Sequence, residues 1–137
     1  MTPLEAKDEI LAIFKTTWDD TGYTAVYDDQ HGQPPDAKQP WARVTLQHDD
    51  NGGQTSLSNG VGNRIFTQTG LLTVQVFVPI ADGLEQNYEL SHRILSAYSP
   101  RQGASVWYTR QRLKEAKANG GFSQINVIIN FSYDDLR

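Results

Sequence analysis

The sequence contains no cysteine among its 137 residues and only one methionine. The absence of cysteine excludes a disulfide framework, a thiol nucleophile, a zinc site built from thiolates and an iron–sulfur cluster. There is no basic excess either, because 16 acidic residues outnumber 12 basic ones and the formal net charge is -4. Such a surface has no general attraction for nucleic acid or anionic lipid. The length is that of one domain, and we expect a single domain over residues 1–137.

Long hydrophobic runs are also missing. No stretch approaches the ~20 apolar residues that a membrane-spanning helix needs. The first ten residues, MTPLEAKDEI, contain neither a basic start nor an apolar run. We therefore expect no signal peptide and no membrane partner.

The segment 64–83 carries the clearest pattern, that of a long strand leading into a helix. Pro79 cannot donate to a ladder, so the strand is expected to end there. Asp82 followed by Glu85 predicts a capped helix start immediately afterwards. The strand has one apolar face, because its hydrophobic residues alternate with polar ones: Leu72, Val74, Val76 and Val78.

Similar patterns predict the remaining elements. A helix over 3–18 starts with Thr2 as the N-cap, and a second helix follows residue 83 with an apolar stripe at helical spacing: Leu84, Tyr88, Ser91, Leu95 and Tyr98. Shorter strands are expected at 23–27, 41–47, 104–114 and 122–133. The fold class is α+β, with two helices on one face of a mainly antiparallel sheet of four to five strands, in the order α-β-β-β-α-β-β.

Two segments lack any periodic pattern. Residues 28–40 contain three prolines, and residues 48–63 are rich in glycine and asparagine, so both are predicted to be loops. Long loops in a compact domain often contact partners.

The last two strands are joined by a sequence that contains Asn119-Gly120, a strong hairpin signal. A strict two-residue turn there would place Arg110 and Arg112 on the aliphatic face of the sheet. A bulge or longer loop shifts the register by one residue and is the interpretation we favour. It moves Trp107, Thr109, Gln111 and Leu113 to the aliphatic face and leaves the basic residues on the other face.

Residues that suggest catalysis are few. His48 is followed by Asp49 and Asp50, but this run is typical of a solvated turn and lacks a second, spaced pair of ligands. Adjacent acids such as Asp19-Asp20 are explained by the end of a helix. We therefore predict no metal, no cofactor and no catalytic residues.

Basic residues at alternate positions form the remaining local signal. Arg110, Arg112 and Lys114, followed by Lys117, would line one face of a strand near a hairpin tip. Such a stripe protects a sheet edge against aggregation, or else contacts an acidic surface or a nucleic-acid backbone.

The order of elements and one extended signature resemble a known family. The signature comprises an acidic and aliphatic N-terminal helix, the segment 60–64, the strand GLLTVQVFVP at 70–79, Gly83 at the start of a helix, and a final long hairpin. Together these features resemble the tail terminator, or tail completion, proteins of long-tailed bacteriophages. The resemblance spans nearly the whole chain and includes no catalytic motif.

The resemblance implies a structural and non-enzymatic role. Proteins of this type form a ring, commonly of six copies, that caps the tail tube protein and presents a surface to the head–tail connector protein. DNA passes through the channel only as cargo, and the protein resides at the head-proximal end of the virion tail after synthesis in the host cytoplasm. We place the interface, as a hypothesis, at these residues: His48, Asp49, Asp50, Arg64, Arg110, Arg112, Lys114 and Lys117.

Two alternatives stay open. One is a head-closure or other neck protein, which sequence does not separate from a tail terminator. The other belongs to a different class, a small ligand-binding α+β domain with a pocket between the second helix and the sheet.

Overall fold

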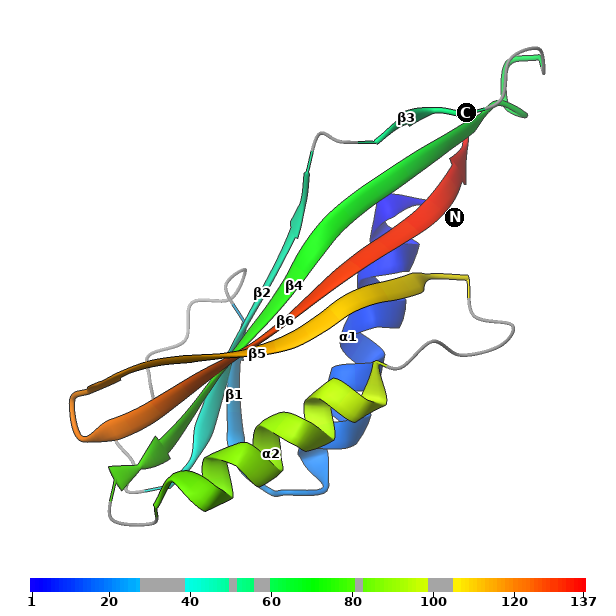
Figure 1. Cartoon of the computed structure of the whole chain (residues 1–137). Coiled ribbons are helices and arrows are strands. Elements are labelled where there is room, and N and C mark those ends of the chain that lie inside the picture. Colours follow the sequence, from blue (N-terminus) through cyan, green and yellow to red (C-terminus); the bar gives the residue numbers. More distant parts are fainter. Residues whose placement is uncertain (28–38, 50–51, 56–59, 81–82, 99–104) are drawn as a thin grey trace.

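The described residues of the protein form one six-stranded sheet with two helices (Figure 1). The structure, a computed structural model, describes residues 1–27, 39–49, 52–55, 60–80, 83–98 and 105–137. Along the chain the elements are α1 (Pro3–Asp19), β1 (Thr24–Tyr27), β2 (Trp41–His48), β3 (Gly53–Gln54), β4 (Ile65–Pro79), α2 (Leu84–Ala97), β5 (Trp107–Asn119) and β6 (Phe122–Leu136).

The sheet has the strand order β1-β2-β4-β6-β5, and the short strand β3 pairs separately with β4. β1 and β2 run parallel, whereas the other neighbours are antiparallel. The expected α+β class is confirmed, but the described part of the chain forms a mixed sheet with one strand more than predicted. The element order is therefore α-β-β-β-β-α-β-β rather than α-β-β-β-α-β-β. The extra strand is β3, which lies in the segment 48–63 that was predicted to be loop. A strand of two residues is too short for an alternation of apolar and polar side chains to be recognised in the sequence.

Helix α1 begins as its sequence predicts. The Thr2 hydroxyl accepts a hydrogen bond from the Glu5 backbone N–H at 3.2 Å, and Pro3 occupies the first turn, where no N–H is needed. One face of the helix is buried, at residues spaced four apart: Ala6, Ile10, Phe14 and Trp18. This face packs into the core that lies between the helices and the sheet.

Both helices lie on the same face of the sheet, as predicted (Figure 1). Alternate residues of β2, β4 and β6 point toward them and are almost fully buried: Ala42, Val44, Leu72, Val74, Val76, Val78, Val127, Ile129, Phe131 and Tyr133. Burial of each large aliphatic or aromatic side chain stabilises the fold by about 1.5–3 kcal/mol. The Tyr98 hydroxyl donates to the Ile10 carbonyl at 2.6 Å and joins the end of α2 to α1.

Helix α2 differs from the prediction at its start. Its N-cap is Gly83, with φ of 85°, and no side chain caps the helix. The predicted capping role of Asp82 lies outside the described residues. Glycine tolerates this positive φ without strain, and it has no side chain that could cap the helix.

The buried stripe of α2 also differs. Leu84 and Tyr88, expected in the core, are 46% and 37% exposed. Ser91 and Tyr98 are buried as predicted, and Asn87, Leu90 and Ile94 complete the buried face. Asn87 was not expected in this stripe, and its burial depends on hydrogen bonds to β4 and β6 that the sequence does not show.

The β5–β6 hairpin confirms part of the predicted register. Its turn is Gly120-Gly121, with φ of 61° and 85°, rather than Asn119-Gly120. A register shift near the turn brings Leu113 opposite Val127 on the aliphatic face, as predicted, with the neighbouring basic residues on the other face.

A second register shift, between Thr109 and Arg112, was not predicted. It returns Trp107 and Thr109 to the face opposite the helices, so their predicted positions are wrong. Arg110 lies in this bulge and has a φ of 53°. In the described part of the chain, no other residue except glycine has a positive φ. A single extra residue moves every side chain beyond it to the other face.

No helix in the described part of the chain is long and apolar enough to cross a membrane.

Candidate interaction surface

The face of the sheet that points away from the helices is a candidate interaction surface. No helix or strand of the described chain packs on it (Figure 1). We call this surface the open face; it consists of the alternate residues of β2, β4, β6 and β5 that do not enter the core. Most of them are partly exposed.

Polar and cationic residues occupy the middle of the open face. The register aligns one row of four residues across four strands: Arg43, Gln75, Asn126 and Lys114. The next row contains Thr45, Thr73, Ile128 and Arg112. Side chains opposite one another on neighbouring strands are in contact range, so these rows form one continuous surface.

An aromatic pair ends the open face on one side. Trp41 stacks on Phe77 with ring centroids 4.3 Å apart, and the Arg43 guanidinium lies 5.6 Å from the Trp41 ring. Aromatic and arginine side chains are enriched in protein–protein interfaces. The alternation of residues 41–47 is the sequence signal for this face, because it separates Arg43, Thr45 and Gln47 from the apolar residues of the same strand.

The basic residues that the sequence singled out lie on β5, at one edge of the sheet. We call Arg110, Arg112, Lys114 and Lys117 the basic stripe. Arg112 donates through Nη1 to the Arg110 carbonyl at 2.8 Å and to Asn130 Oδ1 at 2.9 Å, which holds its guanidinium against the sheet. Arg110, Lys114 and Lys117 are exposed. A bulge and several cations on an edge strand discourage another strand from pairing with it.

His48 and Asp49 lie at the end of β2, away from the basic stripe. His48 Nε2 is 2.6 Å from the Tyr133 hydroxyl, and its ring meets the Phe131 and Tyr133 rings edge-on. Burial lowers the pKa of the His48 imidazole, and nearby Asp49 raises this pKa to a smaller extent. Burial, together with Asp135, raises the pKa of the Tyr133 phenol.

Asp49 forms hydrogen bonds with the neighbouring strand β4. Its carboxylate accepts a hydrogen bond from the Thr69 hydroxyl, and its backbone N–H donates to the Thr69 carbonyl at 3.0 Å. His48 and Asp49 therefore help to join β2 to β4 and β6. Asp50, the third member of this predicted run, lies outside the described residues.

Arg64 lies at a third position, next to the C-terminus. Its backbone exchanges two hydrogen bonds with Arg137, at 3.1 and 2.8 Å. There β4 and β6 extend past the helices (Figure 1). The predicted interface residues thus lie in three separate places: the basic stripe, the His48–Asp49 pair and Arg64. Of these, the basic stripe adjoins the open face.

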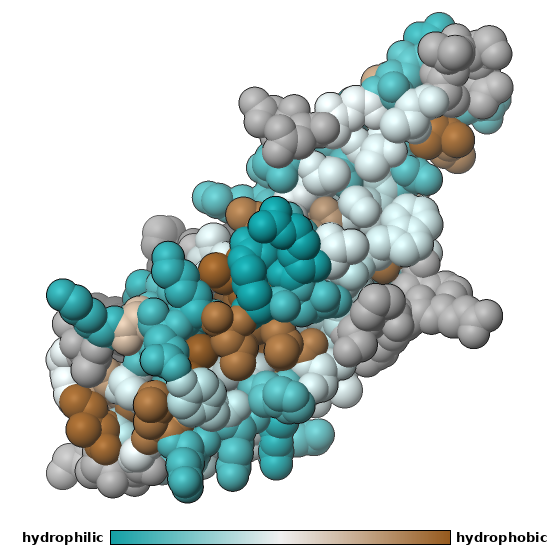
Figure 2. Space-filling view, in the orientation of Figure 1, coloured by the Kyte–Doolittle hydropathy of each residue, from teal (hydrophilic) through white to brown (hydrophobic). Residues whose placement is uncertain are grey.

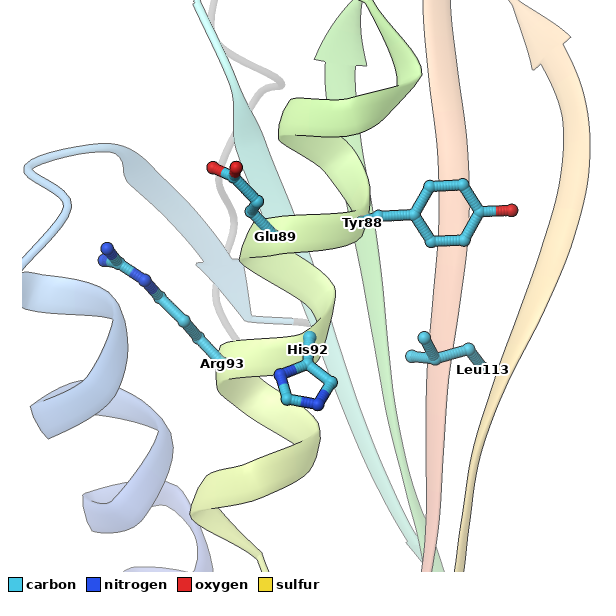
Figure 3. Close-up of a pocket in the computed structure, with 5 residues that line it drawn as sticks. All are labelled: Tyr88, Glu89, His92, Arg93 and Leu113. Carbon is cyan, nitrogen blue, oxygen red and sulfur yellow. The ribbon is translucent and has the colours of Figure 1, made fainter.

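A groove of about 480 Å³ lies between α2 and β5 (Figure 3). Tyr88, His92 and Leu113 line it together with Glu89 and Arg93. Glu89 and Arg93 point away from β5, toward the side where β1 and α1 lie, while Tyr88 and Leu113 lie on the β5 side. The ionisable groups of the groove therefore do not converge on one point. Elsewhere in the described residues, no three histidine, aspartate or glutamate side chains are grouped so as to hold a metal ion.

Comparison with known proteins supports the fold alone. No family model and no curated protein matches the chain. A solved structure without a descriptive name is similar, with a TM-score of 0.60 and 13% sequence identity over 96% of this chain and 97% of that one. The shared fold therefore extends over essentially the whole length of both proteins.

Proposed function

We propose that the protein is a non-enzymatic structural component of a bacteriophage tail. In this role, copies of the chain form a ring that caps the tail tube protein and joins it to the head–tail connector protein at the head-proximal end of the virion. The proposal rests on the resemblance at residues 60–64 and 70–79 and on the character of the molecular surface. DNA enters only as cargo that passes through the ring.

The observation that best supports an assembly role is the open face. It crosses four strands, it combines the partly exposed Phe77 ring, which stacks on the buried Trp41, with amides, hydroxyls and cations, and no helix or strand of the described chain covers it. A surface of this composition is suited to protein contact, since interfaces combine aromatic and arginine residues with a polar rim. Stable protein interfaces bury roughly 1,200–2,000 Å² in total, and a sheet face can supply such an area.

Two measurements test the proposal. The mass in solution, followed by sedimentation over a wide range of protein concentration, is expected to rise from one copy to a closed ring, and negatively stained images are expected to show that ring. Added to growing tail tubes, the protein is expected to stop their elongation. Tubes that grow to the same length with and without the protein would contradict a terminator role.

A head-closure or other neck protein is the nearest alternative. Binding assays separate the two roles, because a terminator binds assembled tail tubes without the connector. A neck protein binds the connector and leaves bare tubes unoccupied.

The groove between α2 and β5 favours a second candidate function, that of a small ligand-binding domain. Tyr88 and Leu113 offer it an apolar wall, and His92 adds a polar group. Pockets that bind small molecules are mostly apolar and have a few convergent polar groups. A strict monomer whose melting temperature rises with a metabolite would support this candidate over the assembly role.

A further inference from the structure

Charge is distributed unevenly over the molecule, and α1 carries a line of acids. At 100° per residue, five exposed residues of α1 fall within about 80° of arc: Glu5, Asp8, Ala12, Thr16 and Asp19. We call them the acidic ridge. It lies opposite the buried residues Ile10 and Phe14 and therefore points away from the core. Ala12 and Thr16 are small, so another surface can approach the ridge closely.

The basic stripe of β5 is the counterpart of the acidic ridge. From Arg110 to Lys117 it is about 23 Å long at the usual rise of a strand, and the acidic ridge from Glu5 to Asp19 is about 21 Å long at the rise of a helix. Figure 2 shows strongly hydrophilic side chains over the middle of β5. The two lines of charge are of opposite sign and of similar length.

No member of either line forms an ion pair within the described part of the chain. Arg137, which pairs with Asp135, belongs to neither line. Within the ridge, Glu5 and Asp8 are three residues apart, where like charges repel. In the basic stripe, Arg112 and Lys114 share one face of β5. An oppositely charged surface would relieve the repulsion in both places.

The two lines lie at opposite sides of the molecule. α1 packs over the β1 side of the sheet, where Phe14 meets Tyr27 edge-on at 6.2 Å and Lys15 lies over the Tyr27 ring. β5 is the edge strand at the other end of the sheet order, four strand spacings or about 19 Å from β1. Contact between the ridge of one copy and the stripe of another is therefore head-to-tail. Such contacts form a closed ring when the rotation between copies closes.

We propose that the basic stripe of β5 docks on the acidic ridge of α1 in the next copy of this chain. The inference rests on the proposed ring and specifies the contact between its subunits. A second copy suits the stripe better than a nucleic-acid backbone, since the ridge matches the stripe in sign and length and the chain as a whole is acidic. Complementary charge would set the orientation of neighbouring copies and speed their encounter.

Charge reversal tests the contact. Arg112→Glu with Lys114→Glu reverses the stripe, and Asp8→Lys with Asp19→Lys reverses the ridge. Each pair of changes is expected to weaken ring formation by roughly tenfold to a thousandfold, because like charges then face each other across the contact. A chain with all four changes is expected to regain assembly, because every contact is again between opposite charges. Assembly of the unaltered protein is expected to weaken as salt is added.

A matched control separates position from net charge. Lys7→Glu with Arg137→Glu changes the net charge as much as reversal of the stripe does. Lys7 lies about 100° of arc from the nearest residue of the ridge, and Arg137 lies beyond the end of β6, on another strand than the stripe. This variant is expected to assemble as the unaltered protein does, and circular dichroism checks that all variants are folded.

The outcomes distinguish this contact from the ring itself. The proposed contact is wrong if rings still form after both reversals, or if the variant with all four changes does not assemble. Neither result would contradict the proposed function. If the protein is monomeric at every concentration and does not bind tail tubes, both the proposed contact and the proposed function are wrong. A third outcome concerns nucleic acid. If the unaltered protein binds a short DNA duplex, and reversal of the stripe abolishes that binding but leaves assembly unchanged, the stripe binds nucleic acid and not a second copy.

Discussion

At Gly70, β4 lies so close to its two neighbours that no side chain fits. It pairs with His48 on β2 and with Phe131 on β6, and it is buried. A methyl group added there would collide with the Gln47 carbonyl oxygen and the Phe131 ring. The first is backbone and the second is a buried ring, so neither can move cheaply.

We therefore expect Gly70→Ala to lower the free energy of unfolding by about 1–3 kcal/mol, the usual cost of overpacking. Gly53→Ala is the matched control, because a methyl group at this strand position meets nothing within 4 Å. It is expected to change stability by less than about 0.5 kcal/mol. Urea unfolding measures both, and equal stability of the two variants would contradict the close approach.

His48 makes stability depend on pH. Its pKa in the folded protein lies below the ordinary value of 6.5, because burial disfavours the charged ring. As pH falls, the unfolded chain therefore takes up the proton first. The contribution of this group is fully present above about pH 6.5 and is lost as pH falls toward the folded pKa.

The expected result is that the difference in unfolding free energy between the unaltered protein and His48→Gln shrinks on acidification from about pH 7.5 to about pH 5. Urea unfolding at several pH values measures this difference. A constant difference over that range would show that the ring titrates alike in the folded and unfolded states.

At the scale of elements, α2 is held to the sheet by a buried amide. Asn87 is fully buried, and its Nδ2 donates to the Val76 and Ser123 carbonyls at 3.2 Å each and to the Ser123 hydroxyl at 3.1 Å. Its carbonyl oxygen accepts from the Ser91 hydroxyl at 3.1 Å. One side chain thus joins α2 to both β4 and β6.

Replacement of Asn87 by alanine is expected to cost about 1–3 kcal/mol of stability, since it leaves buried polar groups without a partner. Gln86→Ala, one residue earlier, removes a hydrogen bond from Nε2 to the Tyr23 hydroxyl at 3.2 Å in a partly exposed position. We expect it to cost about 1 kcal/mol or less. Thermal unfolding compares the stability of the two variants. An equal loss of stability would contradict the role of Asn87 in holding α2 to the sheet.

For the whole molecule, the three tryptophans report on assembly. Trp18 and Trp41 are 2% and 6% exposed, whereas Trp107 on β5 is 53% exposed. Trp107 is on the open face opposite Ser132, on the strand that carries the basic stripe. Burial of this surface between copies would remove the Trp107 indole from water.

The tryptophan emission of the unaltered protein is accordingly expected to shift to shorter wavelength as the concentration rises through the range of ring formation. Trp107→Phe should show no such shift, because its remaining tryptophans are buried already. A shift of equal size in both proteins would mean that Trp107 stays exposed in the assembly.

Much of this architecture follows from local chemistry. The alternation in β4 and β6, the spacing in α1, and the terminating effect of Pro79 depend on neighbours along the chain, and the structure bears them out. The same patterns predicted that both helices would share one face. Hydrophobic periodicity identifies the buried side of an element because it repeats within that element.

Other features depend on contacts between segments far apart in the chain. The bulge at Arg110, the pairing of β3 with β4, and the burial of Asn87 each need a partner strand that no local pattern specifies. The bulge decides which face carries Trp107, and the packing of α2 decides that Leu84 and Tyr88 stay exposed. The basic stripe could be found from its spacing, whereas the position of the acidic ridge on the far side of the sheet emerged only once the strands were ordered. Strand order and register are set by long-range pairing, which local sequence periodicity does not encode.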